Sequence, residues 1–175
     1  MAIKRKQGFT LLEVLITVAV LAILTALAAP SFKAIMDKNT VVAMSNKLLS
    51  VLLLARSEAV KRDQKVYVQS LFSRWDIGVL GYVDRNSNGT YDSAEDGPYI
   101  FQYQFQDPSS IGSGNRVMIQ LVGAGSSLAQ IFYNGRGRGS TGSDIYFQLS
   151  KNGHTRYIGF GAFGGRPFVS DTRPN

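Results

Sequence analysis

The first apolar stretch of the chain covers residues 9–29 and contains one charged residue, Glu13. A helix rises about 1.5 Å per residue, so this stretch would span roughly 30 Å, the thickness of a bilayer's hydrocarbon core. The pattern therefore predicts a membrane-spanning helix over residues 9–30. Residues 4–6 are all basic. Positive charge before a first apolar segment predicts that this end stays in the cytoplasm and that the remaining chain lies across the membrane.

The helical pattern continues after Pro30. Apolar residues recur at spacings of three, four or seven: Val41, Leu48, Leu52, Ala55 and Ala59, with Ile35, Leu49 and Leu53 beside them. The polar residues of this segment fall largely outside the stripe: Lys33, Lys38, Asn46, Lys47 and Arg62. We expect one helix over residues 9–63, loosened or kinked at Pro30, because proline removes a backbone hydrogen bond. Its amphipathic half, 31–63, should pack on the domain that follows.

From residue 64 the pattern changes to an alternation of apolar and polar positions, which is typical of strands. Turn-forming residues separate eight such segments: 66–72, 75–83, 99–105, 116–122, 130–133, 145–149, 157–160 and 167–169. The sequence thus predicts an α+β protein. A long N-terminal helix, membrane-spanning in its first half, would pack against an antiparallel β-sheet or β-sandwich in a β-rich domain over residues 64–175.

Composition limits the chemistry of this domain. The chain has 175 residues and no cysteine, which excludes disulfides, thiol nucleophiles, iron–sulfur clusters and thiolate zinc sites. Its single histidine, His154, lies in a turn sequence, and no Gly-x-Ser-x-Gly motif is present. We therefore expect a single domain that is neither an enzyme nor dependent on a cofactor.

A carboxylate within a membrane helix costs about 2.5–3.5 kcal/mol, and less near the helix end, so Glu13 needs an explanation. It could be close enough to the membrane surface to stay hydrated. A secretory signal peptide is a second alternative, but the apolar stretch is too long for one, and Pro30 follows the small residues at its end.

Residues 8–13 read Gly-Phe-Thr-Leu-Leu-Glu and resemble the type IV prepilin signature. The resemblance implies that a prepilin peptidase removes residues 1–8 by cutting between Gly8 and Phe9, and that the new N-terminal Phe9 is methylated. It also implies that Glu13 neutralises the N-terminal amine of a neighbouring pilin subunit during assembly.

Three further segments, 55–62, 75–78 and 84–89, resemble minor pilins and pseudopilins of the GspH/FimT family. The family implies a pilin-like fold. It also implies a single-pass inner-membrane protein with a periplasmic β-rich domain, which then assembles with other pilin subunits through its N-terminal helix into a pilus at the cell surface.

Residues 84–95 match the calcium-loop pattern Asp-x-Asn-x-Asn-Gly-x5-Glu. The ligands would be Asp84, Asn86, Asn88, Asp92 and Glu95. The pattern lacks the flanking helices of an EF-hand, because a strand pattern precedes it and Gly-Pro follows it. We therefore favour a polar loop in which Asn and Asp side chains bond to their own backbone and Gly89 has a positive φ. Calcium binding stays the alternative.

Charge is unevenly distributed along the β-rich domain. Residues 70–115 carry two arginines and six acidic residues, whereas residues 116–175 carry seven basic residues, six of them arginine, and two acidic ones. Aromatic residues are interleaved with these arginines. Arginine forks suit phosphate oxygens, so the basic part predicts binding of a polyanion.

Within this basic part, residues 134–139 read Asn-Gly-Arg-Gly-Arg-Gly between two strand patterns. Gly135, Arg136, Gly137 and Arg138 resemble the GRxR motif of DNA-binding minor pilins of the FimT type. We expect a hairpin tip in which both arginines and backbone amides bind phosphate, and in which the glycines allow close approach to the ligand. Lys151, Arg156 and Arg166 are secondary candidates. The alternative is a solvated turn whose charge is incidental.

Two functions follow. The first is a minor pilin of a type IV pilus that binds double-stranded DNA non-specifically for uptake in natural transformation. The second is a structural minor pseudopilin of a type II secretion system. The arginines of residues 134–139 favour the first function.

Overall fold

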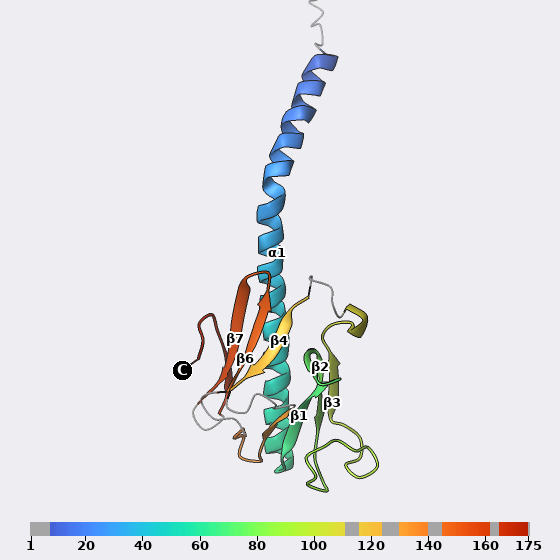
Figure 1. Cartoon of the computed structure of the whole chain (residues 1–175), viewed down its shortest axis with the longest axis vertical. Coiled ribbons are helices and arrows are strands. Elements are labelled where there is room, and N and C mark those ends of the chain that lie inside the picture. The colour runs from blue at the N-terminus through green and yellow to red at the C-terminus, as the bar shows by residue number, and fades with distance from the viewer. Residues whose placement is uncertain (1–7, 111–115, 124–129, 140–144, 162–164, 175) are drawn as a thin grey trace, which may run out of the picture. The chain divides into compact units, whose positions relative to one another are not determined.

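The computed structural model describes residues 8–110, 116–123, 130–139, 145–161 and 165–174 (Figure 1). The chain divides into two units, the first ending at Met36 and the second covering Asp37–Asn175. We call the second unit the head unit. Each unit is described by itself.

Helix α1 covers Leu11–Arg62 and is assigned without a break through residue 30. It begins two residues later than predicted because Thr10 is its N-cap: the Thr10 hydroxyl accepts a hydrogen bond from the Glu13 N–H at 3.2 Å. Lys61 and Arg62 lie in its last turn, where positive charge stabilises the helix dipole. The predicted continuous helix is confirmed to within two residues at each end.

The first unit contributes an apolar helical segment, Leu11–Leu27, whose side chains are exposed in the isolated chain. Among the described residues, Ser31–Arg62 is long and apolar enough to cross a membrane, by length and composition alone, and Leu11–Leu27 is a shorter apolar helix. Ser31–Arg62 contains charged residues throughout, and its apolar stripe is buried in the head unit. We therefore assign the part of this segment from Asp37 to Arg62 to the core of the head unit.

The predicted apolar stripe of α1 forms one side of the core. Its five main residues are at most 1% exposed: Val41, Leu48, Leu52, Ala55 and Ala59. Ile35, which was expected to widen the stripe, is 56% exposed and belongs to the first unit. The head unit therefore begins to cover the helix only after Met36.

The described residues of the head unit form eight strands in two antiparallel four-stranded sheets. The first sheet has the order β3-β2-β1-β5 and the second β4-β6-β7-β8. The strands are β1 Val66–Leu71, β2 Arg74–Tyr82, β3 Phe101–Gln104, β4 Met118–Val122, β5 Gln130–Tyr133, β6 Tyr146–Lys151, β7 His154–Phe160 and β8 Pro167–Ser170, with a short 3₁₀ helix at Pro108–Ser110. All eight predicted strands are present within a few residues, and the α+β class is confirmed.

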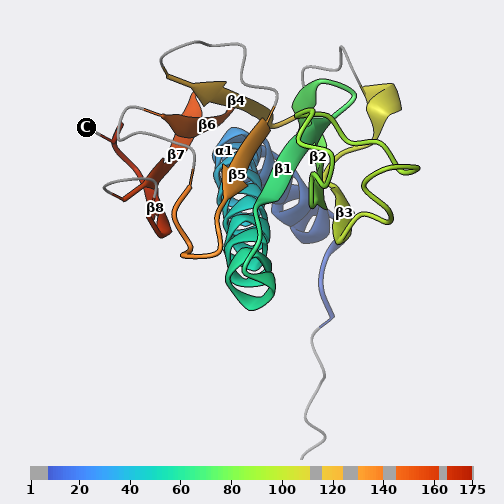
Figure 2. The ribbon, with the colours of Figure 1, turned by 90° about the horizontal axis from the view of Figure 1, so that it is seen from below.

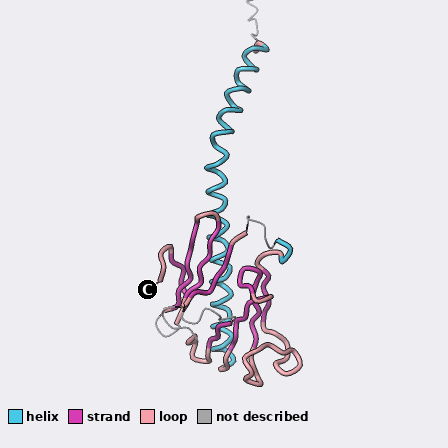
Figure 3. The backbone as a smooth tube through the Cα atoms, in the orientation of Figure 1, coloured by secondary structure: helices cyan, strands magenta, loops and turns pink. Residues whose placement is uncertain are grey.

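The two sheets lie next to each other over the helix of the head unit (Figures 2 and 3). Buried residues of both sheets pack on the stripe of α1, among them Val68 and Ile131 from the first sheet and Phe147 and Ile158 from the second. The helix therefore supplies the core that neither sheet could complete alone.

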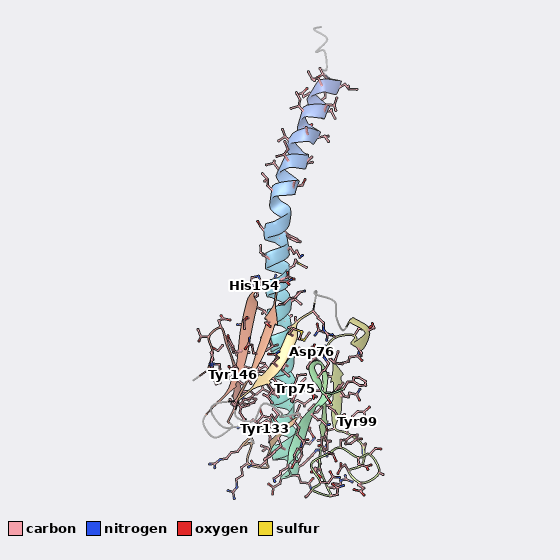
Figure 4. All side chains as sticks on the ribbon, in the orientation of Figure 1. Trp75, Asp76, Tyr99, Tyr133, Tyr146 and His154 are labelled. Carbon is pink, nitrogen blue, oxygen red and sulfur yellow. The ribbon has the colours of Figure 1, made fainter. Side chains whose placement is uncertain are left out.

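Strand β2 joins the two sheets through its first residues (Figure 4). The Trp75 ring meets the Phe147 ring edge-on, with ring centroids 4.8 Å apart. The carboxylate of Asp76 accepts hydrogen bonds from Arg74 at 2.8 Å and from Arg116 at 2.6 Å. Because Asp76 and Arg116 are both buried, this pair is costly to break and fixes β2 beside β4.

Candidate functional site

The segment 134–139, which we call the arginine loop, is closed by Asn134. The Asn134 side-chain oxygen accepts hydrogen bonds from the backbone N–H groups of Arg136 and Arg138, both at 3.0 Å. Its backbone carbonyl accepts from Gly137 N, and its N–H donates to the Arg138 carbonyl, both at 2.8 Å. The amides of Arg136, Gly137 and Arg138 are thus used inside the loop. The expectation that these amides would bind phosphate is therefore wrong.

The arginine loop is held against the C-terminal end of α1. Arg56 Nε donates a hydrogen bond to the Gly137 carbonyl at 2.9 Å. Gly137 has φ +71°, and a Cβ there would lie 3.1 Å from Arg56 Nε. A Cβ on Gly135 would collide with the Asp63 carboxylate and lie 2.9 Å from the Asp63 backbone. Both glycines are therefore explained by the close approach of the loop to α1.

This packing leaves the two arginine side chains in solvent. Arg136 and Arg138 are exposed, and neither guanidinium has an ion-pair or hydrogen-bond partner among the residues that the structure describes. The loop backbone is thus held in place while the two guanidinium groups are exposed. Each guanidinium group can make paired hydrogen bonds to phosphate oxygens.

Three further cations lie at the same end of the head unit. Lys61 and Arg62 pair with Glu58 at 3.7 and 2.8 Å, yet their side chains stay 74% and 43% exposed. The Arg62 hydrogen bond holds the pKa of Glu58 below its ordinary value. Lys65 lies over the Phe132 ring, 5.0 Å from its centroid.

Sequence reasoning missed these cations as part of the site, although they form a visible basic run around residue 62. The sequence alone could not show that these cations lie beside the arginine loop. The pairing of Val66 with Tyr133 and the approach of Gly135 to Asp63 bring the run beside the arginine loop.

The secondary candidates lie in three different environments. Lys151 does not lie where a DNA contact was expected, since its side chain is 7% exposed and its Nζ pairs with Asp37 at 3.0 Å. This contradicts its role as a phosphate contact. Arg156 pairs with Asp171 at 2.8 Å and lines a groove with Lys38 and Val41. Arg166 is exposed, just before β8.

Arg156 and the arginine loop lie at opposite ends of the head unit. Figure 4 shows His154, two residues before Arg156, at one end of the sheets, and Tyr133, which precedes the loop, towards the other end. The contacts with α1 lead to the same conclusion. Val41 lies beside Arg156 and Arg56 contacts the arginine loop, and at 1.5 Å per residue these two helix positions are about 22 Å apart. Arg156 is therefore remote from the arginine loop.

Residues 84–96, which we call the acidic loop, use their polar side chains on their own backbone. Asn86 accepts from Asn88 N at 3.0 Å, and Asn88 accepts from Thr90 N at 2.8 Å. Asp84 accepts from Gly89 N at 2.8 Å, and Gly89 has φ +78°. The predicted self-bonded loop with a positive φ at Gly89 is confirmed.

Asp96 closes the acidic loop. Its two carboxylate oxygens accept hydrogen bonds from Arg85 N at 2.8 Å and from Asp92 N at 2.9 Å. The Asp92 N–H, followed by Arg85, holds the pKa of Asp96 below its ordinary value. Asn86 contacts Glu95, and Asp84 Oδ1 is buried without a partner. In the described part of the chain, no group of three His, Asp or Glu side chains could hold a metal ion. That the loop does not bind calcium stays a prediction.

The predicted processing site lies outside regular structure. Gly8 has no neighbouring atom within 4 Å of an added Cβ, and Phe9 is 84% exposed. Glu13 lies in the first turn of α1 and is exposed. The peptide bond between Gly8 and Phe9 is thus sterically accessible.

Two protein-family models match this chain, one over most of the head unit and one over the N-terminal segment. Residues 44–160 match the family described as type II transport protein GspH. Residues 3–29 match the prokaryotic N-terminal methylation motif. A curated relative, the pilin-like protein PilA1 of Thermus thermophilus, is 26% identical over 155 residues, covering 87% of this chain and 92% of that protein.

Two crystal forms of the type IV minor pilin FimU from Pseudomonas aeruginosa PAO1 share the fold. They give TM-scores of 0.58 and 0.55 at 16% identity. They cover 81% and 76% of this chain, and 96% and 95% of the FimU chains. The pilin-like fold predicted from the sequence is confirmed.

Proposed function

This chain belongs to the GspH family, and from that membership we propose that it is a minor pilin of a type IV pilus whose head unit binds double-stranded DNA without sequence preference. The DNA would be taken up in natural transformation. Before assembly the protein would be a single-pass inner-membrane protein with a periplasmic head unit, and afterwards part of a pilus at the cell surface.

The observation that carries the proposal is the arginine loop. Arg136 and Arg138 are exposed and unpaired within the described structure, while the backbone between them is held by Asn134 and Arg56. An arginine that only stabilised the fold would be expected to have a partner. Lys61, Arg62 and Lys65 add positive charge beside it, and this supports a phosphate-binding surface.

Contacts from this surface should be to phosphate and independent of sequence. The arginine loop is itself a tight turn, so within residues 134–139 it offers no helix or β-ribbon that could enter the major groove. Neutralising about three to five phosphates gives a log–log salt slope of roughly −3 to −5. Weak binding by one head unit is compatible with uptake, because several head units can engage one long polymer.

The test is a DNA titration of a soluble chain that starts at Ser31, at several salt concentrations. The Arg136→Ala, Arg138→Ala double variant should reduce the salt slope by about two. Arg156→Ala is the matched control, because it removes an ion-paired arginine at the other end of the head unit, and it should change little. Unaltered binding in the double variant would refute the loop assignment.

A second function has its own support, since the matching family is described as a type II transport protein. In this alternative the chain is a structural minor pseudopilin of a type II secretion system. It predicts no binding of the unmodified chain to duplex DNA even at low salt, and that result would favour it.

Processing and assembly are common to both functions. We propose that prepilin peptidase cuts between Gly8 and Phe9, and mass spectrometry of membrane-extracted protein should find N-methylated Phe9. Glu13 would pair with the N-terminal amine of another pilin subunit. Glu13→Ala should leave membrane insertion intact, because removing a charge favours insertion, but should prevent recovery of the protein in sheared filaments.

A further inference from the structure

A groove of about 340 Å³ lies in the head unit between α1 and the beginning of β7, where Figure 4 labels His154. Lys38, Val41 and Val42 line the groove from the helix, and His154 and Arg156 line it from the strand. The two strand residues are two positions apart, so their side chains leave the same face of β7. The groove thus combines two apolar side chains with three basic ones.

The two sides of the groove are fixed relative to each other. The first residue of the head unit, Asp37, pairs with Lys151 at 3.0 Å and accepts a hydrogen bond from Asn152 at 2.8 Å. Lys151 is directly opposite His154 in the β6–β7 hairpin. The Lys151–Asp37 pair is neutral as a whole, so it adds no net charge beside the groove. A ligand that binds in this groove would therefore lose little free energy in ordering its walls.

The basic side chains of the groove have unused hydrogen-bond donors. In the described part of the chain, neither the Lys38 ammonium group nor the His154 ring has an ion-pair or hydrogen-bond partner. Arg156 Nε donates a hydrogen bond to Asp171 at 2.8 Å, and the Asp171 side chain is 79% exposed. One largely hydrated carboxylate therefore faces three basic groups.

The strand side of the groove is not covered by a neighbouring strand. Strand β8 pairs with β7 only from Tyr157 to Phe160. Residues 154–156 pair with β6 alone among the strands that the structure describes. A ligand can therefore reach His154 and Arg156 without displacing a strand.

We propose that this groove binds inorganic phosphate or a phosphate monoester. Its ammonium, imidazolium and guanidinium groups can donate charge-assisted hydrogen bonds from two different elements. A terminal phosphate offers three acceptor oxygens and close to two negative charges, whereas a carboxylate offers two oxygens and one charge. The two valines can contact the carbon part of an ester. A DNA phosphodiester has one charge and a sugar on each side, so this inference does not rest on DNA binding.

The test uses the full-length chain in non-ionic detergent and follows the ring signals of its only histidine by NMR. Histidine rings titrate between about pH 5 and 8, so the pH midpoint of these signals responds to an anion that binds beside the ring. Inorganic phosphate should raise this midpoint by about half a unit. Sodium chloride at the same ionic strength should not. Equal midpoints in phosphate and in chloride would overturn the proposal.

Two substitutions should change the phosphate affinity in opposite directions. Lys38→Gln removes a positive charge and should weaken binding about two- to fivefold, whereas Asp171→Asn removes the competing carboxylate and should strengthen it by a similar factor. Arg166→Gln is the matched control, because this exposed arginine precedes Pro167, which pairs with Phe160 at the other end of β7. Unchanged affinity in both Lys38→Gln and Asp171→Asn would contradict the assignment of the site.

Two further ligands identify the source of the phosphate group. Phosphatidic acid in lipid nanodiscs that raises the midpoint without free phosphate would assign the groove to a lipid headgroup. A response to free phosphate alone would assign it to a soluble phosphate. Duplex DNA should leave the midpoint unchanged, and a shift with DNA equal to that with phosphate would refute a monoester site. Loss of DNA binding at the arginine loop would leave the phosphate response intact, so the two proposals fail separately.

Discussion

The acidic loop and the arginine loop leave the same end of the first sheet and differ in what their charges do. Strand β2 ends at Tyr82, opposite Tyr67, and β5 ends one position away, where Tyr133 pairs with Val66. Both loops are closed by Asn or Asp side chains that accept backbone N–H groups. In the acidic loop the charged side chains of Asp84 and Asp96 take part in that closure beside neutral asparagines. In the arginine loop a neutral residue, Asn134, supplies it.

This difference indicates which charges are available for binding. Asp84 and Asp96 accept hydrogen bonds from backbone donors of their own loop, whereas the side chains of Arg136 and Arg138 make no contact that the loop needs. Gln130 connects the two regions: it accepts a hydrogen bond from the Tyr82 hydroxyl and donates one to the Gly89 carbonyl, at 2.9 and 2.7 Å. Opposite charges therefore lie on loops that follow β2 and β5, the strands on either side of β1, which should keep a polyanion on the β5 side of the sheet.

The largest expected effect comes from adding a methyl group to the arginine loop. Gly135→Ala would collide with Asp63 and should destabilise the head unit by roughly 1–3 kcal/mol, weakening DNA binding as the loop moves off α1. Thermal unfolding and DNA titration measure the two effects. Gly161→Ala is the control, because its Cβ would meet only ordinary contacts at 3.7 Å or more. Equal stability of both variants would contradict the packing of the loop on α1.

The glycine of the acidic loop serves a different purpose. Gly89 has φ +78° and open space around it, with its nearest contact 3.7 Å away. Gly89→Ala should therefore cost only the backbone strain of about 1 kcal/mol, and it should leave DNA binding unchanged. Loss of DNA binding in this variant would show that the two loops are not independent.

The Asp96 carboxylate should set the lower limit of the pH range in which the acidic loop stays closed. A carboxyl whose pKa is lowered in the folded state adds stability that is present above its unfolded pKa and is lost as pH falls through the folded pKa. The Asp92 and Arg85 amides should therefore keep their native NMR shifts from pH 8 to about pH 5 and lose them only below about pH 4. Asp96→Asn should show the altered shifts at every pH, because its amide group cannot accept both N–H groups. A midpoint near neutral pH would contradict this assignment.

Neutralising the exposed carboxylates of the acidic loop should have a small effect. The Asp92→Asn, Glu95→Gln double variant keeps a side-chain oxygen at each position, so the loop should stay closed. Its DNA affinity should rise about two- to threefold at low salt. The gain should vanish near 0.15 M, where the Debye length is about 8 Å. A large gain that persisted in salt would place these carboxylates inside the DNA surface.

Calcium should have the smallest effect of all. The Asx oxygens already accept backbone N–H groups, so we expect no heat of binding at sub-millimolar calcium. A micromolar site that is lost in Asp84→Ala would reverse this prediction and assign the buried, unpartnered Asp84 Oδ1 to a ligand.

The sequence predicted local structure well because local structure depends on nearby residues. The apolar spacing identified the five buried residues of the α1 stripe, and alternation identified all eight strands. It could not divide the strands into two sheets, since that depends on pairings between strands far apart in the sequence, such as β1 with β5.

The candidate site was predicted only in part for the same reason. The GRxR resemblance drew attention to Arg136 and Arg138. Arg56, which holds the loop, lies 81 residues from Gly137, and no local pattern links them. Lys151 looked like one more surface cation, and only the position of the hairpin beside Asp37 shows that it is buried.

The Asp37 contact determines how mechanical force enters the head unit. Asp37 pairs with Lys151 at 3.0 Å and accepts a hydrogen bond from Asn152 at 2.8 Å, so the first turn of the helix in this unit is tied to the β6–β7 hairpin. Tension carried along α1 reaches this tie where the helix enters the unit. Because the strands run alongside the helix, a pull along its axis loads the buried stripe in shear, with many contacts strained at once. The head unit should therefore resist axial pulling better than it would resist the peeling of a single strand.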